Sequence, residues 1–210
     1  MAISMLGKGL HEARHYEDAL PVYEAEFCMK RRVGAPLGNI LIVMGNIATT
    51  YRNVGRNEEA LPLMRDTYFG FLRLNGEQHY DTIREASNYA NSLVGLNRFE
   101  EAKTLLRKMI PVVRRVLGEN HDLMLTMRWN YAEALYKDDG AMLDDLREAV
   151  TTLEETTRTA RRVMGRAHPL AMNIELSLRE SREALSARDG SSLSGAFAAM
   201  TPRDAQDPPS

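Results

Sequence analysis

The feature of this sequence that most constrains its fold is a short pattern that recurs at a fixed spacing. Asn-Ile-Ala at residues 46–48 is followed by Asn-Tyr-Ala at 88–90 and again at 130–132, a step of 42 residues each time. A second pattern, Glu-Glu-Ala, follows the first two copies at 58–60 and 100–102. Self-similarity at a period of roughly 20–50 residues indicates an array of stacked repeats.

Each repeat is predicted to be a pair of α-helices. Between residues 81 and 96 the apolar residues fall three and four positions apart, which is typical of one face of a helix. A second such stretch follows and ends at Gly118, a residue suited to a left-handed helix C-cap. The same frame places first helices near 2–13, 38–54, 80–95, 122–137 and 169–184, and second helices near 16–32, 57–74, 98–117 and 144–164.

The fifth repeat is incomplete in this frame. Its first helix carries Arg179 where earlier repeats have a small alanine, so it is predicted to cap the array. The predicted fold class is therefore all-α: a right-handed α-solenoid of about four helix-pair repeats plus a C-terminal capping helix. Residues 1–186 are predicted to form the array, and residues 187–210, rich in Ser, Gly, Asp and Pro, to form a disordered tail.

Composition restricts the classes of function. The chain has 27 basic and 29 acidic residues and a net charge of −2, which gives no general attraction to nucleic acid or anionic membranes. A single cysteine, Cys28, excludes an internal disulfide and suits a reducing compartment. No stretch approaches the roughly 20 apolar residues that a membrane helix needs. We expect a cytoplasmic protein without cofactor.

Two groups of residues suggest metal sites at first sight. His79, His121 and His168 each follow a predicted cap by three residues, so they lie about one repeat apart, too far for one tetrahedral ion. They are predicted to cap the next helix instead. A calcium loop with Gly140 at its invariant glycine would have Leu135 and Leu146 at its first and last ligand positions, so the acidic residues 138–142, inserted in repeat four, are predicted to form a solvated loop. No catalytic motif is present, and we expect no enzyme.

The helix pair with small residues twelve positions apart, such as Ala90 and Ala102, resembles the tetratricopeptide repeat, whose usual unit has roughly 34 residues. The longer unit here, with Leu-Gly-Glu-Asn-His-Asp at 117–122, looks like the repeat of kinesin light chains. Gly-Glu-Gln-His at 76–79 and Gly-Arg-Ala-His-Pro at 165–169 are similar to the same loop. The resemblance covers about residues 1–185.

The resemblance implies an adaptor or scaffold that binds an extended peptide or partner segment. In this family the first helices line a concave groove, and asparagines at the positions of Asn46, Asn88 and Asn130 bond the peptide backbone; an amide suits this because it donates and accepts. On neighbouring faces of the same helices we expect further groove residues: Arg52, Asn53, Arg84, Asn91, Trp129, Glu133 and Lys137. The cations among them would receive ligand carboxylates and Trp129 would anchor an aromatic motif.

Other interpretations of the same residues stay open. The asparagines could instead bond neighbouring helices. The protein could be a fixed structural subunit of a larger assembly, or the regulatory repeat fragment of a longer protein.

Overall fold

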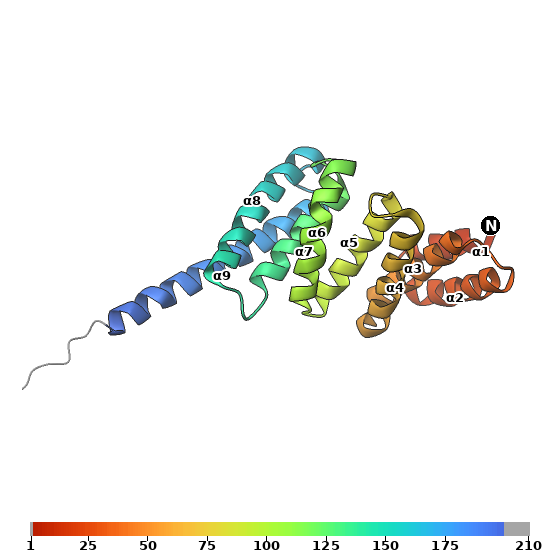
Figure 1. The fold of residues 1–210 in the computed structure, drawn as a ribbon, viewed down its shortest axis with the longest axis horizontal. Coiled ribbons are helices and arrows are strands. Elements are labelled where there is room, and N and C mark those ends of the chain that lie inside the picture. Colours follow the sequence, from red (N-terminus) through yellow and green to blue (C-terminus); the bar gives the residue numbers. More distant parts are fainter. Residues whose placement is uncertain (1, 200–210) are drawn as a thin grey trace, which may run out of the picture.

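The computed structural model describes residues 2–199, with side chains to residue 189, and every element in that range is an α-helix (Figure 1). This confirms the predicted all-α fold. The helices are α1 (Ala2–Glu12), α2 (Tyr16–Arg32), α3 (Leu37–Asn53), α4 (Asn57–Asn75), α5 (Tyr80–Gly95), α6 (Phe99–Leu117), α7 (Asp122–Tyr136), α8 (Leu143–Met164) and α9 (Pro169–Ala199).

The helices stack side by side along one axis (Figure 1), as predicted for an α-solenoid. Each helix packs on the next in sequence, and the first helices α3, α5, α7 and α9 also contact one another in succession. Among the described residues, consecutive second helices make no contacts of comparable extent. The first helices therefore lie closer together and form the inner face of the array.

The core is built around pairs of alanines. Ala48 with Ala60 and Ala90 with Ala102 are completely buried, and all belong to one hydrophobic cluster that extends from α3 to α9. A smaller cluster, centred on Tyr23, joins α2 to α3. Burial of these apolar side chains is the main driving force for stacking.

The turns require left-handed backbone at equivalent positions. Within three of the helix pairs the connection contains one residue with positive φ: Arg14 at 63°, Gly55 at 82° and Asn97 at 57°. Between repeats, Gly118 ends α6 with φ of 80°, and its N–H donates to the Arg114 carbonyl at 3.0 Å. Glycine adopts this conformation without the steric cost of a Cβ atom, so the predicted glycine cap is confirmed.

The three loop histidines cap the helices that follow them. The Nδ1 atoms of His79, His121 and His168 accept hydrogen bonds from the backbone N–H two residues later, at 3.2, 3.1 and 3.2 Å. Each bond satisfies a donor that the first turn of a helix leaves unpaired. The predicted capping role is confirmed.

The C-terminal helix is longer than predicted. α9 continues to Ala199 instead of ending near residue 184, so the predicted boundary at 186–187 is not the end of a helix. Alanine is the strongest helix former, and it occurs at 187, 196, 198 and 199, which offsets the Ser and Gly content of this segment. Residues 200–210 lie outside the described residues, and a disordered tail there stays a prediction.

The insertion in repeat four is not simply a solvated loop. Ala141 is only 3% exposed and belongs to the main hydrophobic cluster. The Asp138 carboxylate accepts hydrogen bonds from the Gly140 N–H at 3.0 Å and from Lys103 Nζ at 3.3 Å. The prediction of a solvated loop was wrong because it rested on the charged residues of the segment, whereas the burial of Ala141 packs the segment against the core.

Lys103 depends on this insertion. Its side chain on α6 is almost fully buried, and its ammonium pairs with Glu100 at 2.5 Å and with Asp138 at 3.3 Å. Burial by itself lowers the pKa of Lys103, but the hydrogen bonds to Glu100 and Asp138 outweigh it, so the pKa is raised. The insertion thus supplies the less exposed of the two carboxylates that hold this charge.

Removal of a histidine cap should destabilise the array modestly. His121→Ala leaves the first-turn N–H of Leu123 without its acceptor, and the free energy of unfolding should fall by about 1 kcal/mol. His121→Asn supplies a side-chain oxygen at the same position and should restore most of that loss. Urea unfolding followed by circular dichroism measures both; equal losses for the two variants would contradict the capping role.

Loss of the Asp138 carboxylate should cost more than loss of its exposed neighbour. Asp138→Ala leaves buried Lys103 with one partner and should lower the free energy of unfolding by about 1–3 kcal/mol. Asp139→Ala, an exposed change in the same loop, should stay within about 0.5 kcal/mol of wild type. If both variants unfold at the same urea concentration, the loop carries no buried ion pair.

Candidate functional site

The inner face carries the three repeated asparagines in different environments. Asn46 on α3 and Asn88 on α5 are half-buried, whereas Asn130 on α7 is only 1% exposed. Among the described residues the side-chain amide of Asn46 makes no hydrogen bond. Its backbone carbonyl accepts a hydrogen bond from Thr50 Oγ1 at 2.8 Å. The Asn88 Nδ2 donates to Glu85 Oε2 at 3.3 Å.

Asn130 differs from the expectation of an accessible ladder. Its Nδ2 is buried and has no partner among the described residues, so no ligand reaches it without moving its neighbours. The accessible amides of the ladder are therefore Asn46 and Asn88. None of the three amides bonds a neighbouring helix in the part of the chain that the structure describes, since the one bond of Asn88 stays within α5.

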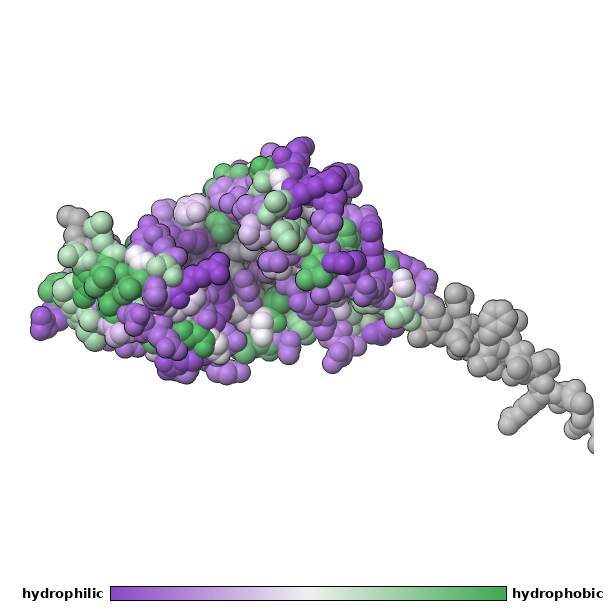
Figure 2. All heavy atoms as spheres, turned by 180° about the vertical axis from the view of Figure 1, so that it is seen from behind, coloured by the Kyte–Doolittle hydropathy of each residue, from purple (hydrophilic) through white to green (hydrophobic). Residues whose placement is uncertain are grey.

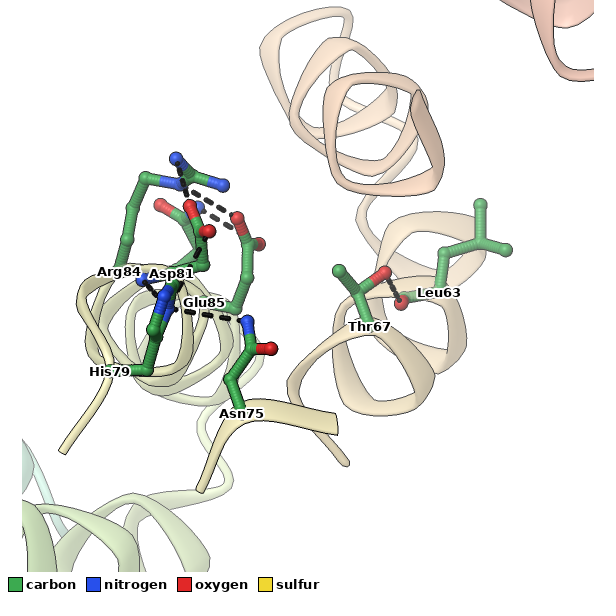
Figure 3. A network of polar contacts seen from close by, with 8 residues as sticks. Leu63, Thr67, Asn75, His79, Asp81, Arg84 and Glu85 are labelled. Atoms are coloured by element: carbon green, nitrogen blue, oxygen red, sulfur yellow. Dashed lines mark hydrogen bonds and ion pairs between the residues drawn. The ribbon is translucent and has the colours of Figure 1, made fainter. Parts of the chain in front are cut away.

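A network of charges surrounds Asn88. Glu85 is buried, and its Oε1 accepts a hydrogen bond from Arg84 Nε at 2.9 Å, while Arg84 Nη1 pairs with Asp81 at 2.9 Å (Figure 3). A Cβ atom added at Gly45 of α3 would lie 3.2 Å from the Glu85 carboxylate, so this glycine makes room for it. Contrary to expectation, Arg84 is engaged with two carboxylates of its own chain and is not free for a ligand carboxylate.

Two further predicted residues lie at the end of α3. Arg52 is half-buried, and its Nη1 is a buried donor without a partner among the described residues. Burial lowers the pKa of Arg52, and the charge of Glu85 partly offsets that effect. Exposed Asn53 places its Nδ2 3.4 Å from His11 Nε2, and His11 Nδ1 lies 3.1 Å from Thr50 Oγ1.

Three predicted residues at α7, Trp129 and Glu133 within it and Lys137 directly after it, instead contact the neighbouring helix or each other. Trp129 Nε1 donates to Ser177 Oγ of α9 at 2.9 Å, and that hydroxyl donates to Glu133 at 3.4 Å. Glu133 also pairs with Lys137. Trp129 and Lys137 therefore serve internal contacts, in contrast to the expected anchor and carboxylate receiver, because α9 packs directly on α7.

Sequence reasoning missed Glu85 and Ser177, the buried partners in these networks. No signal in one sequence marks them, because a helix pattern does not show which polar residue a neighbouring helix covers. The remaining predicted residue, Asn91, is half-buried on α5.

Other kinds of site are poorly supported in the described part of the chain. Within it, no three His, Cys, Asp or Glu side chains gather as a metal site would require. Cys28 is exposed on α2. None of the described helices combines the length and the apolar character needed to cross a membrane.

Comparison with known proteins explains the repeat. The sequence profile of the tetratricopeptide repeat matches residues 41–81 and 86–122. Residues 41–81 and 86–122 therefore form tetratricopeptide repeats. Such repeats generally mediate protein–protein interaction and typically form scaffolds that are not enzymes. Among curated proteins, none matches the sequence.

Solved structures place the fold among repeats of the kinesin light chain type. The nearly identical TPR-like repeats of a kinesin light chain-type protein from Podosopora anserina share 18% identity, with a TM-score of 0.70, over 97% of this chain and 96% of that one. A variant of those repeats has a TM-score of 0.72 and 18% identity, over 94% of this chain and 92% of that one. BtubC (BKLC) from P. vanneervenii has a TM-score of 0.70 and 14% identity, over 99% of this chain and 84% of that one. At these identities the likeness shows the fold.

The half-buried histidine beside Asn53, His11, should make stability depend on pH. Burial, followed by the charge of Arg52, lowers the pKa of His11 below its ordinary value of 6.5. Because the unfolded chain takes up a proton near pH 6.5 and the folded chain only at lower pH, the free energy of unfolding should fall as the pH drops below about 6.5.

The variant His11→Asn isolates this effect, because the other four histidines are unchanged. Wild type and variant should be compared by urea unfolding between pH 7.5 and pH 5. The stability of the wild type relative to the variant should decline as the pH falls. A constant difference would show that His11 titrates normally in the folded protein.

Proposed function

We propose that this tetratricopeptide repeat protein is an adaptor whose inner face, formed by α3, α5 and α7, holds an extended peptide or partner segment. The observation that carries the proposal is the unused hydrogen-bonding capacity of half-buried amides on this face. A primary amide donates two hydrogen bonds and accepts two. Asn46 uses none of this capacity within the described residues, and Asn88 uses one N–H on Glu85.

The alternative role of the asparagines would require bonds between helices. Those bonds are made by other residues of the same face: Trp129 and Ser177 join α7 to α9, and His11 lies against Thr50 between α1 and α3. The side-chain amides of Asn46 and Asn88 thus make no hydrogen bond between helices in the described part of the chain. An extended peptide needs alternating donors and acceptors for its backbone, which amides at neighbouring repeats provide.

The charges of the face favour recognition of the backbone over recognition of acidic side chains. Arg84 and Lys137 are compensated by carboxylates of the same chain. The Nη1 of Arg52 has no partner in the described part of the chain, but this atom is buried, and a ligand would reach it only if neighbouring side chains moved. The exposed, unpaired Cys28 suits a reducing compartment, so we propose that the adaptor acts in the cytoplasm.

Asn46→Ala tests the proposal more cleanly than Asn88→Ala. The Asn46 amide bonds no described residue, so its removal should leave the melting temperature nearly unchanged. The affinity for peptides selected on the wild-type protein from a displayed random library should fall about ten- to hundredfold, the cost of about 1–3 kcal/mol for a ligand group left unpaired. Isothermal titration calorimetry and thermal unfolding measure the two quantities.

Two matched variants complete the test. Asn88→Ala should lower both affinity and stability, because Glu85 loses a donor. Gln78→Ala removes an exposed amide from the loop before α5 and should change neither. If Asn46→Ala binds the selected peptides as tightly as Gln78→Ala does, the peptides do not use the asparagines and the proposed binding face is wrong.

A further inference from the structure

A large cleft lies between α8 and α9, at the C-terminal end of the array. It has a volume of about 800 Å³ and six arginines line it: Arg158, Arg161, Arg162, Arg166, Arg179 and Arg182. Only two carboxylates, Glu154 and Glu175, line it with them. The excess of four positive charges contrasts with the net charge of −2 of the whole chain.

The repeat shows what this cleft corresponds to. Two repeats earlier, a smaller cleft of about 410 Å³ is lined by apolar and aromatic residues of α4 and α5 and by residues of α6. Phe69, Leu72 and Leu93 of that cleft lie 89 residues before Arg158, Arg161 and Arg182, which is two periods of 42 residues plus the five inserted residues.

The arginine-lined cleft is therefore the place where the second helix of a fifth repeat would pack. In the described residues no second helix follows α9, which runs on as a single helix to Ala199. An end of a repeat array needs a polar surface, and both signs of charge supply one equally well. Capping alone does not account for a surplus of one sign.

Internal pairs neutralise only part of the charge. Arg161 Nε donates to Glu175 at 3.2 Å, and Arg182 pairs with Glu154 at 2.5 Å. The hydrogen bond from Arg161, followed by its charge and those of Arg166 and Arg179, holds the pKa of Glu175 below its usual value. Arg158, Arg166 and Arg179 make no hydrogen bond to a carboxylate in the described part of the chain.

The floor of the cleft also contains a polar group without a partner. Thr157 of α8 lines the cleft and is only 5% exposed, and its Oγ1 has no hydrogen-bond partner among the described residues. A buried hydroxyl left in this state costs free energy. It lies at the position that Tyr68 occupies in the apolar cleft, 89 residues earlier.

We propose that this cleft binds an acidic helical segment of a partner protein, which packs against α8 and α9 in the place of a second helix. Carboxylates on one face of that segment would pair with Arg158, Arg166 and Arg179 in bidentate geometry. The position of the cleft favours a helix because a helix, α6, packs on α5 and forms one wall of the equivalent cleft. This site is separate from the inner face and does not rest on the function proposed for it.

A second copy of the chain fits this cleft less well. The opposite end of the array is hydrophobic, with Met5 and Leu6 of α1 exposed at 73% and 56% (Figure 2). The single carboxylate of α1, Glu12, already pairs with Lys8 at 3.6 Å. A hydrophobic end does not complement an arginine-lined cleft, so head-to-tail stacking of copies is disfavoured.

The experiment uses a labelled helical peptide of about 15 residues with four glutamates on one face, and the same peptide with glutamines, in fluorescence anisotropy at low salt with the full chain. The glutamate peptide should bind, and its affinity should fall with added salt. Arg158→Gln with Arg179→Gln should weaken binding at least about tenfold, since two charged contacts are lost. Both arginines are exposed and outside ion pairs, so the fold should be unaffected.

Two controls separate the cleft from general charge and from structure. Arg73→Gln with Arg115→Gln removes the same charge from exposed positions on α4 and α6 and should leave binding unchanged. Thr157→Val keeps the shape of this side chain and should leave the melting temperature unchanged, because the buried hydroxyl has no hydrogen bond to lose in the described part of the chain.

Several outcomes would overturn the proposal. One is that the glutamate and glutamine peptides bind with equal affinity. Another is that the double variant at Arg158 and Arg179 and the control double variant at Arg73 and Arg115 lose the same affinity. A single-stranded oligonucleotide that binds more tightly than the peptide, with the same dependence on Arg158 and Arg179, would assign the cleft to nucleic acid. Sedimentation that shows a dimer abolished by the same variants would assign it to self-association.

Discussion

The close packing of helices at completely buried alanines is the contact on which the rest of this structure depends. Ala48, Ala60, Ala90, Ala102 and Ala132 recur in register, and each has no exposed surface. A larger side chain at such a position would overpack the core at a cost of about 1–3 kcal/mol. Because every repeat keeps this contact, each pair of helices stacks on the next in the same way and the first helices gather on one face.

That arrangement separates two kinds of polar residue on the inner face. Some polar side chains take part in helix packing. Trp129 and Ser177, for example, form a hydrogen bond with each other between α7 and α9. Others, Asn46 above all, lie beside the packed surfaces and keep their hydrogen-bonding capacity. The inner face that we propose for binding therefore consists of polar groups that the contacts between helices do not use.

The two ends of the array present contrasting surfaces for the same physical reason. A helix pair buries one side on its neighbour, and at an end that side has no neighbour. At α1 the open side shows Met5 and Leu6 to solvent, whereas at α9 the core position is filled by Arg179 and the cleft beside it is lined with arginine. The first surface favours apolar contacts and the second favours anionic ones.

The sequence by itself determined the helix pairs, their period and their caps. These depend on residues near one another in the chain: apolar residues three or four apart, a glycine such as Gly118, and a histidine such as His121 that bonds a backbone N–H two residues away. For this reason the predicted helices agree closely with the observed ones up to the start of α9. The end of α9 was missed because helix propensity and composition point in opposite directions there.

Only the tertiary structure decided which polar residues are available. Asn46, Asn88 and Asn130 are equivalent in sequence, yet one amide is unbonded, one bonds Glu85 and one is buried. The same is true of Ala141, whose burial the acidic sequence around it hides. The burial of Asn130, and of the Glu85 carboxylate that Asn88 bonds, depends on neighbouring helices; Glu85 lies against Gly45, some 40 residues away, and a local pattern does not contain that information.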